Sequence, residues 1–425
     1  MSAAQVVRIG LLGFGTIGSS VYRLIEKEHD EILTGMGVDL QVAKILEIDQ
    51  SKIPADVPVH LVTSDFANIV DDPSIDIVVE VIGGTDAAFT FVEKAIRRGK
   101  DVVTANKQLL ASKGEPLFCL ARDERRQLRF EASVAGAIPI IKVMRESMVA
   151  AGVHTVYGIV NGTTNYILTR MYNDEGDYAD ILAEAQRLGY AEADPTADVG
   201  GGDAAAKMAI LGSIAFRSRV TLQDVAYEGI QNIGLGDVRY AKDFGFVVKL
   251  IGAARLIDGR VSVRVFPALL PKDHPLAGIS GSNNAVFVQG DAVGEIMLMG
   301  PGAGGMPTAT AVVSDIVSIA SVKEVGFLQN CSCYRSLDFY PAADVESAFF
   351  IKMDVEDVSG ALASIAAVFG ERGVSIKSMI QKGRGAEAEL VLITHPTQES
   401  AFFAAIEQAG RLSCCKSHPM TLRVL

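Results

Sequence analysis

The chain begins with an apolar strand, a glycine-rich turn and an amphipathic helix, and this order constrains its fold more than any other feature. Val6 to Leu12 reads VVRIGLL, with the length and β-branching of a buried strand. Ser19 to Lys27 reads as a helix, and the turn between the two segments is Gly13-Phe14-Gly15-Thr16-Ile17-Gly18. Glycines at these positions let the backbone turn tightly and approach a pyrophosphate, which lies at the helix N-terminus. The turn therefore predicts a dinucleotide-binding site; the alternative is a tight turn without a ligand.

The alternation of strands and helices continues through the first third of the chain. Strand-like runs occupy residues 40–46, 75–81 and 101–104, and Ala87 to Arg98 reads as a helix that ends before Gly99. Strands that alternate with helices predict a parallel sheet with helices on its faces. The expected fold class is α/β, with a Rossmann-type parallel sheet formed by this part of the chain.

The end of the second strand bears on the type of dinucleotide. It reads Lys44-Ile45-Leu46-Glu47-Ile48-Asp49, with two carboxylates and no arginine. A carboxylate at this point accepts hydrogen bonds from ribose hydroxyls and repels a 2′-phosphate. Glu47 therefore favours NAD over NADP as the cofactor. The alternative is that both acids are only solvated.

Composition excludes several classes of protein. Hydrophobic residues make up 49% of the 425 and charged residues 21%, which is typical of a globular protein with two or three domains of roughly 150 residues. The net charge of −12, without a block rich in Lys and Arg, argues against nucleic-acid and anionic-membrane partners. We expect no signal peptide, and no apolar run approaches the roughly 18 residues of a bilayer span. An odd set of cysteines without a CxxC pair favours reduced thiols in the cytoplasm: Cys119, Cys331, Cys333, Cys414 and Cys415.

Longer motifs follow in one order from residue 80 onward. They are Glu80-Val81-Ile82-Gly83-Gly84, Val103-Thr104-Ala105-Asn106-Lys107, Asn161-Gly162-Thr163-Thr164-Asn165-Tyr166, the run from Gly189 to Val199, and Asp203-Ala204-Ala205-Ala206-Lys207. This series resembles the homoserine dehydrogenase family, and the match covers nearly the whole chain. The tail from Ala348 to Leu425 resembles the ACT regulatory domain of the longer bacterial members.

The resemblance implies an NAD(P)-dependent oxidoreductase that reduces L-aspartate 4-semialdehyde to L-homoserine, in threonine, methionine and isoleucine biosynthesis. It implies that Lys207 donates the proton to the carbonyl oxygen, while Lys107 polarises that oxygen or shares the role. The residues themselves support Lys207, because its helix reads AAAKMAILGSIAF and is apolar on nearly all sides. A buried lysine near a carboxylate is a candidate proton-transfer group. The alternative is a surface ion pair between Lys207 and Asp203.

The segment GYAEADPTADVGGGD carries four carboxylates, which suit a cationic ligand. The residues alone leave open a solvated acidic loop, or a helix cap at Asp203. The resemblance implies that Glu192 and Asp203 hold the ammonium group of the substrate. It also assigns to the substrate site Gly162, Thr163 and Tyr190.

The resemblance adds two further sets of ligands. It assigns to the cofactor site, besides the N-terminal turn and Glu47, Thr85, Thr104, Lys107, Gly189 and Gly304. It also implies a sodium ion bound by the side chain of Glu131 and by the carbonyls of Val134, Gly136 and Ile138. Oxygen ligands suit a hard cation. In sequence terms this last segment is only a strand-to-helix crossover.

Three units are expected. By the resemblance, residues 1–150 and 302–335 form a discontinuous dinucleotide-binding domain. Residues 151–301 form an α+β substrate and dimerisation domain, and residues 346–425 a βαββαβ ferredoxin-like ACT domain. By resemblance the middle unit's sheet forms the interface of a homodimer or homotetramer. The tail is expected to bind an amino-acid effector, by analogy threonine, near the loop from Asp357 to Leu362. The alternative is a tail that serves only oligomerisation.

Two departures from the family pattern qualify these expectations. Gly200-Gly201-Gly202 precedes Asp203, with Gly200 where the family usually has Glu, so the loop has a larger ordering cost. Ser359 stands where ACT domains commonly carry Pro. A non-catalytic sensor of NAD or an amino acid is the competing hypothesis, and the joint presence of Lys107, Glu192, Asp203 and Lys207 argues against it. A thioester-forming aspartate semialdehyde dehydrogenase is disfavoured, because the only cysteine in the first 330 residues lies in an apolar helix.

Overall fold

The computed structural model of the protein describes residues 5–322, 333, 335–383 and 388–425. Its N-terminal part forms a parallel six-stranded sheet in the order β3-β2-β1-β4-β5-β6. The strands are β1 (Gln5–Leu12), β2 (Val38–Leu46), β3 (Val62–Thr63), β4 (Ile77–Glu80), β5 (Asp101–Thr104) and β6 (Leu128–Arg129). This strand order is that of the doubly wound dinucleotide-binding fold, so the Rossmann-type prediction is confirmed.

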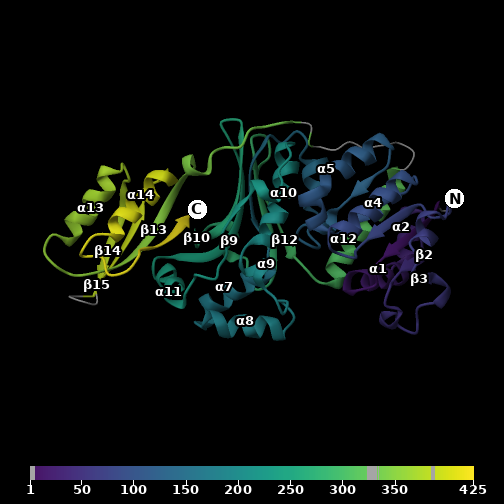
Figure 1. Ribbon diagram of the computed structural model, residues 1–425, viewed down its shortest axis with the longest axis horizontal. Coiled ribbons are helices and arrows are strands. Elements are labelled where there is room, and N and C mark those ends of the chain that lie inside the picture. The colour runs from purple at the N-terminus through teal and green to yellow at the C-terminus, as the bar shows by residue number, and fades with distance from the viewer. Residues whose placement is uncertain (1–4, 323–332, 334, 384–387) are drawn as a thin grey trace.

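Helices flank this sheet and join its strands. They are α1 (Thr16–Lys27), α2 (His29–Met36), α3 (Ala67–Val70), α4 (Asp86–Arg97) and α5 (Lys107–Asp123). A helix from much later in the chain, α12 (Gly305–Val322), lies beside α1 (Figure 1). The two approach closely at Gly305, where a Cβ would lie 2.4 Å from the Ser20 hydroxyl. The chain therefore returns to the first sheet after a long excursion; residues 323–332 and 334 of the expected segment 302–335 lie outside the described residues.

α12 is long and apolar enough, by length and composition alone, to cross a membrane. Half of it is buried inside the protein, and Ala309, Val312 and Ile316 belong to the apolar cluster beneath β1 and α1. It also carries the buried acid Asp315. In this structure α12 is thus a core helix of the first unit.

The middle of the chain forms a mixed sheet with helices on one side. Its strands are β7 (Val153–Ile159), β8 (Ala226–Tyr227), β9 (Phe246–Ile257), β10 (Arg260–Pro271), β11 (Asn283–Gly290) and β12 (Gly294–Pro301). Its helices are α6 (Ile140–Lys142), α7 (Gly162–Asp174), α8 (Tyr178–Arg187), α9 (Thr196–Val199), α10 (Gly202–Phe216) and α11 (Leu235–Asp243). The sequence analysis did not predict β12, whose apolar run from Ile296 to Met299 is only four residues long and in which no residue is buried.

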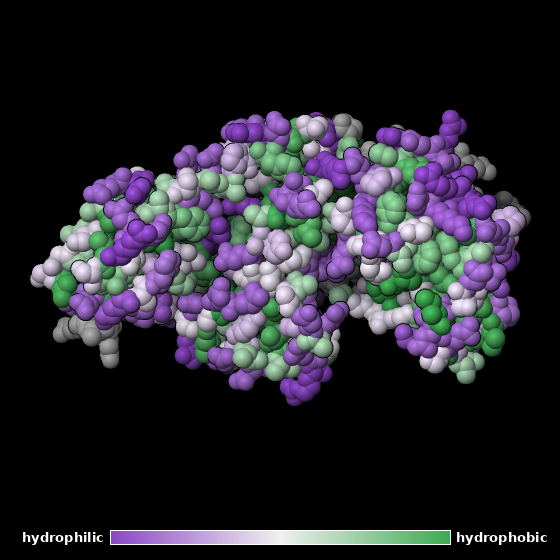
Figure 2. Space-filling view, viewed as in Figure 1, coloured by the Kyte–Doolittle hydropathy of each residue, from purple (hydrophilic) through white to green (hydrophobic). Residues whose placement is uncertain are grey.

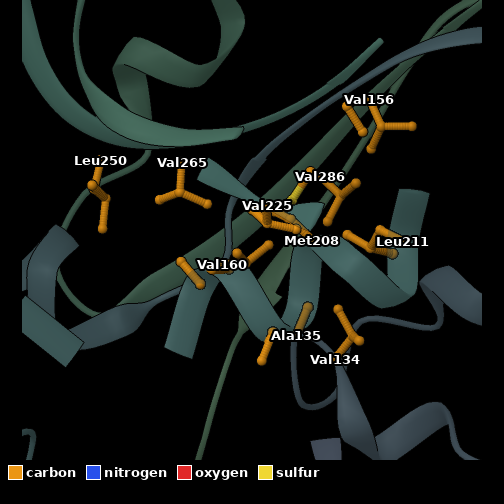
Figure 3. Close-up of a cluster of buried hydrophobic side chains, with 14 of the residues drawn as sticks. Val134, Ala135, Val156, Val160, Met208, Leu211, Val225, Leu250, Val265 and Val286 are labelled. Carbon is orange, nitrogen blue, oxygen red and sulfur yellow. The ribbon is translucent and has the colours of Figure 1, made fainter. Parts of the chain in front are cut away.

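The core of this middle unit lies between α10 and the sheet (Figure 3). Met208 and Leu211 of α10 pack with Val156 of β7 and Val286 of β11, and Val134 of the crossover joins the same cluster. Because α10 is buried along nearly its whole length, any polar group on it is held in an apolar environment.

The C-terminal unit continues the mixed sheet. Its elements are β13 (Glu346–Val355), α13 (Ala361–Glu371), β14 (Ile376–Lys382), β15 (Ala388–Thr394), β16 (Thr397–Gln398), α14 (Glu399–Gly410) and β17 (Met420–Val424). The strand order β17-β13-β15-β14 confirms the ferredoxin-like prediction. β17 also pairs in parallel with β10, so one sheet runs through the middle and C-terminal units, as Figure 1 shows. On the face in Figure 2, hydrophilic residues are spread over the whole molecule with smaller apolar areas between them.

Candidate active site

Lys207 lies on the buried helix α10, one turn after Asp203. α10 begins after Gly201, which adopts the left-handed φ of 88° that only glycine takes without strain. The Lys207 Nζ donates to Asp203 Oδ2 at 2.7 Å and to the Val160 carbonyl at 2.8 Å. Asp203 is therefore not the helix cap, and the exposed ion pair considered from the sequence is excluded because the two residues are only 8% and 9% exposed.

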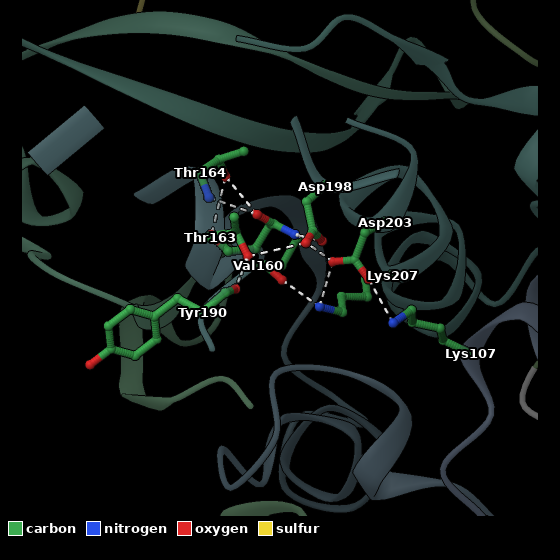
Figure 4. A network of polar contacts seen from close by, with 9 residues as sticks. Lys107, Val160, Thr163, Thr164, Tyr190, Asp198, Asp203 and Lys207 are labelled. Atoms are coloured by element: carbon green, nitrogen blue, oxygen red, sulfur yellow. Dashed lines mark hydrogen bonds and ion pairs between the residues drawn. The ribbon is translucent and has the colours of Figure 1, made fainter. Parts of the chain in front are cut away.

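Lys107 reaches the same carboxylate from the other sheet. It is the first residue of α5, directly after the carboxyl end of β5, and its Nζ lies 2.7 Å from Asp203 Oδ1. The start of α5 is held by Asn106, whose side chain accepts from the Leu109 amide and donates to the Gly84 carbonyl. Figure 4 shows Asp203 between the two lysines. Two units of the protein thus meet at one acid.

The charges in this group support one another. Burial alone would raise the pKa of Asp203, but the ammonium groups of Lys207 and Lys107 hold it well below its ordinary value. Burial alone would lower the pKa of Lys107, but the Asp203 carboxylate raises it above the ordinary value. The carboxylate is therefore ionised and Lys107 is charged at neutral pH.

Asn161 and Asp198 complete the network. The sequence placed Asp198 only among the four acids of its loop, and it assigned no role to Asn161. The Asn161 side chain caps α7 by accepting from the Thr164 amide, and its Nδ2 donates to Asp198 Oδ1 at 2.7 Å and Asp203 Oδ2 at 2.9 Å. Burial, followed by the Asp203 charge, raises the pKa of Asp198. For Asn161 the sequence offered one local signal, since an Asn directly before Gly-Thr-Thr is a typical helix cap.

The other expected substrate residues surround this network. The Thr163 hydroxyl lies 2.5 Å from the Tyr190 carbonyl oxygen and 3.1 Å from Asp198 Oδ2, and these two acceptors share its one O–H. Gly162 opens α7 with no room for a side chain, because a Cβ would lie 2.7 Å from the Ser282 carbonyl oxygen. The Glu192 carboxylate is exposed and forms no ion pair with the described part of the chain, yet its charge acts on Lys107.

The glycine-rich turn has the backbone that the sequence predicted. Gly13 has a φ of 95°, and a Cβ at Gly18 would lie 2.0 Å from the Gly13 carbonyl oxygen, so this close packing of turn and helix requires glycine. At Gly15, by contrast, a Cβ would meet nothing within 4 Å, so the turn is open there to a ligand. The Phe14 amide donates to Glu47 Oε2 at 3.0 Å, which holds the Glu47 carboxylate beside the turn. These features fit a bound dinucleotide.

Two of the remaining cofactor candidates, Thr85 and Thr104, lie at or after the carboxyl ends of strands of the same sheet, and the other two, Gly189 and Gly304, come from later parts of the chain. The Thr104 hydroxyl donates to the fully buried Glu80 at 2.6 Å, while Thr85 precedes α4 and Gly304, with a φ of 119°, precedes α12. Gly189 follows α8 with a φ of 78°. Burial raises the pKa of Glu80, a residue of the first quoted motif to which the sequence assigned no role.

The crossover segment after β6 is tightly bound by its own chain. Glu131 accepts the amides of Ile141 and Lys142, both at 2.8 Å. Gly136 has a φ of 57°, and a Cβ there would lie 2.7 Å from the Gly302 carbonyl oxygen. Val134 and Ile138 are buried beside it. Burial and the neighbouring Asp315 charge raise the pKa of Glu131 to about 7. Within the described ranges no group of three His, Cys, Asp or Glu side chains is placed to hold a metal ion.

A Rossmann-type sheet whose carboxyl edge meets a buried aspartate paired with two lysines fits a nicotinamide-dependent oxidoreductase. Comparison with known families narrows this class. The model described as "Homoserine dehydrogenase" matches residues 139–317, "Homoserine dehydrogenase, NAD binding domain" matches 13–131, and "ACT domain" matches 349–413. The chain belongs to the homoserine dehydrogenase family and is an oxidoreductase with a nicotinamide cofactor.

Individual relatives support the same conclusion over nearly the full length. The homoserine dehydrogenase of Bacillus subtilis is 40% identical over 99% of this chain and 98% of its own. That of Corynebacterium glutamicum is 44% identical over 95% of this chain and 92% of its own. The crystal structure of a homoserine dehydrogenase from Thiobacillus denitrificans superimposes with a TM-score of 0.94 at 37% identity, covering 99% of this chain and 98% of that one.

Proposed function

We propose that the chain reduces L-aspartate 4-semialdehyde to L-homoserine with NAD(P)H, the reaction of the family to which it belongs. One observation carries the proposal: Lys107, after β5, and Lys207, on α10, share the buried carboxylate of Asp203. The two ammonium groups thus lie at the carboxyl edge of the cofactor sheet, where such folds bind the reacting ends of their ligands.

In this proposal the two lysines act on one oxygen. Lys207 donates the proton to the substrate carbonyl oxygen, since the Val160 carbonyl and Asp203 orient its ammonium and occupy two of its three N–H groups. Lys107 stabilises the negative charge that develops on the same oxygen, and Asp203 keeps this lysine charged. A bound nicotinamide supplies the hydride. Burial of the group excludes water and strengthens its charge interactions.

Acidic groups bind the other end of the substrate. Glu192 and Asp203 hold its ammonium group, and Gly162, Thr163 and Tyr190 border it. The Glu192 carboxylate supports this role, because it forms no ion pair with any residue that the structure describes. So does the acceptor capacity of Asp203, which receives three hydrogen bonds where a carboxylate has about four acceptor positions.

Glu47 supports NAD as the preferred cofactor. Its carboxylate, held by the Phe14 amide beside the glycine-rich turn, would accept a ribose hydroxyl and repel a 2′-phosphate. The test is the ratio of kcat/KM for NADH and NADPH in the unchanged protein and in Glu47→Gln, which should use NADPH relatively better. A strong NADPH preference of the unchanged protein contradicts the proposal.

A sodium ion bound by Glu131 and the carbonyls of Val134, Gly136 and Ile138 is proposed as a structural element. Glu131 and Asp315 are two buried, adjacent acids, and a monovalent cation would offset their charge. Replacing sodium by choline chloride at constant ionic strength should lower the melting temperature, and Glu131→Gln should abolish this difference. An equal melting temperature in both salts contradicts the site.

The remaining proposals concern organisation and regulation. The dinucleotide-binding unit comprises residues 1–150 and 302–335, the substrate unit residues 151–301 and the ACT unit residues 346–425. The protein works in the cytoplasm. It forms a homodimer or homotetramer through the mixed sheet. Threonine binds near the loop from Asp357 to Leu362, which follows β13 and reaches α13. If threonine changes neither the activity nor the melting temperature, the effector proposal fails.

The deciding experiment is nicotinamide oxidation by the full chain with aspartate semialdehyde. We expect turnover, and we expect Lys207→Ala to lower kcat by about a hundredfold or more with cofactor affinity unchanged. A near-normal kcat in this variant contradicts the role of Lys207. Nucleotide binding without turnover by the unchanged protein would favour the non-catalytic sensor instead.

A further inference from the structure

A second buried lysine, Lys249, lies in the middle unit away from the Asp203 group. It is on β9, is 2% exposed, and no ion pair joins it to the described residues. Its Nζ donates to Asn165 Oδ1 at 2.9 Å and to the Ile279 carbonyl oxygen at 2.5 Å. Burial lowers the pKa of Lys249 from its ordinary 10.5 to about 8, so the ammonium form prevails at neutral pH. A buried charge that has only neutral acceptors is costly to the fold.

The partners of Lys249 join a loop to a helix. Besides accepting from Lys249, Asn165 of α7 donates through Nδ2 to the Ile279 carbonyl at 3.3 Å and to the Asn283 carbonyl at 3.0 Å. One ammonium and one amide therefore fasten residues 279–283 to the first turns of α7. The Gly281 amide adds a further bond to Thr169, at 3.3 Å.

The same loop touches the end of α7 that faces the active site. The Ser282 carbonyl lies so close to Gly162 that a Cβ on that residue would be 2.7 Å away. The next residue towards the N-terminus, Asn161, caps α7 and donates to Asp198 and Asp203. The start of α7 is thus held on one side by the loop and on the other by the acids of the site.

We infer that Lys249 is a positioning residue for the substrate half of the active site. Through Asn165 and the loop at residues 279–283 it fixes the start of α7, and so the placement of Asn161 and Asp203. The cofactor turn belongs to the other sheet and shares none of these contacts. Loss of the ammonium should therefore weaken substrate binding and leave cofactor binding unchanged. The inference rests on the proposed function, because it concerns that same site.

The test compares three variants of the full chain. Lys249→Met and Asn165→Ala should each raise KM for homoserine by about tenfold with KM for the nicotinamide cofactor within about twofold of the unchanged protein. Lys242→Met is the matched control: Lys242 donates to the Tyr172 carbonyl near the far end of the same helix and is partly exposed, so both KM values should stay unchanged.

A purely structural role gives a different pattern. It reduces the folded fraction, which lowers the apparent kcat and leaves both KM values as they were, and that result overturns the inference. An equal rise of both KM values, or a rise for Lys242→Met as large as for Lys249→Met, overturns it as well. If Lys249→Met does not fold, Asn165→Ala decides by the same criteria. Absence of turnover in the unchanged protein is a distinct outcome, which refutes the proposed function itself.

Discussion

Replacing Glu399 by glutamine tests how the C-terminal unit is attached to the central sheet. The buried Glu399 carboxylate accepts from Arg264 of β10 at 2.7 Å, from Arg423 of β17 at 2.8 and 2.9 Å, and from Ser347 at 2.8 Å. Burial alone would raise the pKa of Glu399, but Arg423 and Arg264 lower it from its ordinary 4.5 to about 2. The folded protein therefore strongly favours the charged form.

The magnitude follows from this pKa. The pKa of Glu399 falls from 4.5 to about 2, and each tenfold change in the proton equilibrium is worth about 1.4 kcal/mol. The charged form of Glu399 therefore contributes at most about 3 kcal/mol to the free energy of unfolding. The two arginines and Ser347 also line a hollow of 840 Å³, where water screens the charges. We therefore expect Glu399→Gln to cost about 2 kcal/mol at neutral pH. Because the folded-state pKa is depressed, this stabilisation is complete well above pH 4.5 and is lost as the pH falls towards 2.

Hydrogen–deuterium exchange of the β13 and β17 amides measures this cost. At pH 7 the amides of these strands should exchange about 30-fold faster in the variant than in the unchanged protein. This ratio of exchange rates should be smaller at pH 4, after correction for the intrinsic exchange rates of the amides. Glu407→Gln is the control, because Glu407 pairs with Arg411 on the exposed face of the same helix and should change stability by less than about 0.5 kcal/mol. Equal exchange in the two variants, or a ratio that does not depend on pH, refutes the reasoning.

Three further predictions concern the cofactor turn, the inter-unit ion pair and the crossover. Gly18→Ala should weaken NADH binding at least about tenfold in a fluorescence titration, since its Cβ would lie 2.0 Å from a carbonyl oxygen, whereas Gly35→Ala, with nothing within 4 Å, should bind normally. Lys107→Arg should lower kcat at least about tenfold, because a planar guanidinium does not replace a compact ammonium beside Asp203; a kcat within twofold refutes this. Gly136→Ala should cost about 1–3 kcal/mol of stability, seen as a lower melting temperature, since its φ is 57° and a backbone carbonyl lies 2.7 Å from the new Cβ; unchanged melting contradicts it.

Much of the fold could be read from local patterns. β5 occupies the expected residues, and the helix predicted from Ala87 to Arg98 is α4, shifted by one residue. The patterning failed at β12, in which no residue is buried and which was not predicted. Periodicity reports burial, so an exposed strand gives no signal.

The candidate site could be read in part. Residue types and spacing indicated Lys207 with Asp203, because both lie on one face of a helix that is apolar elsewhere. Spacing could not decide between a surface ion pair, a helix cap and a buried group. The structure decided it, since α10 is covered by the mixed sheet and Gly201 takes the capping position.

The sequence by itself determined the strand–turn–helix that begins the chain, the βαββαβ tail and the class of cofactor, because each follows from neighbouring residues and their local geometry. Only the tertiary structure decided that Lys107 reaches Asp203 and that β17 pairs with β10. Each of these contacts joins residues about a hundred or more positions apart. They depend on how distant parts of the chain pack and pair in three dimensions, and local propensity carries no information about such contacts.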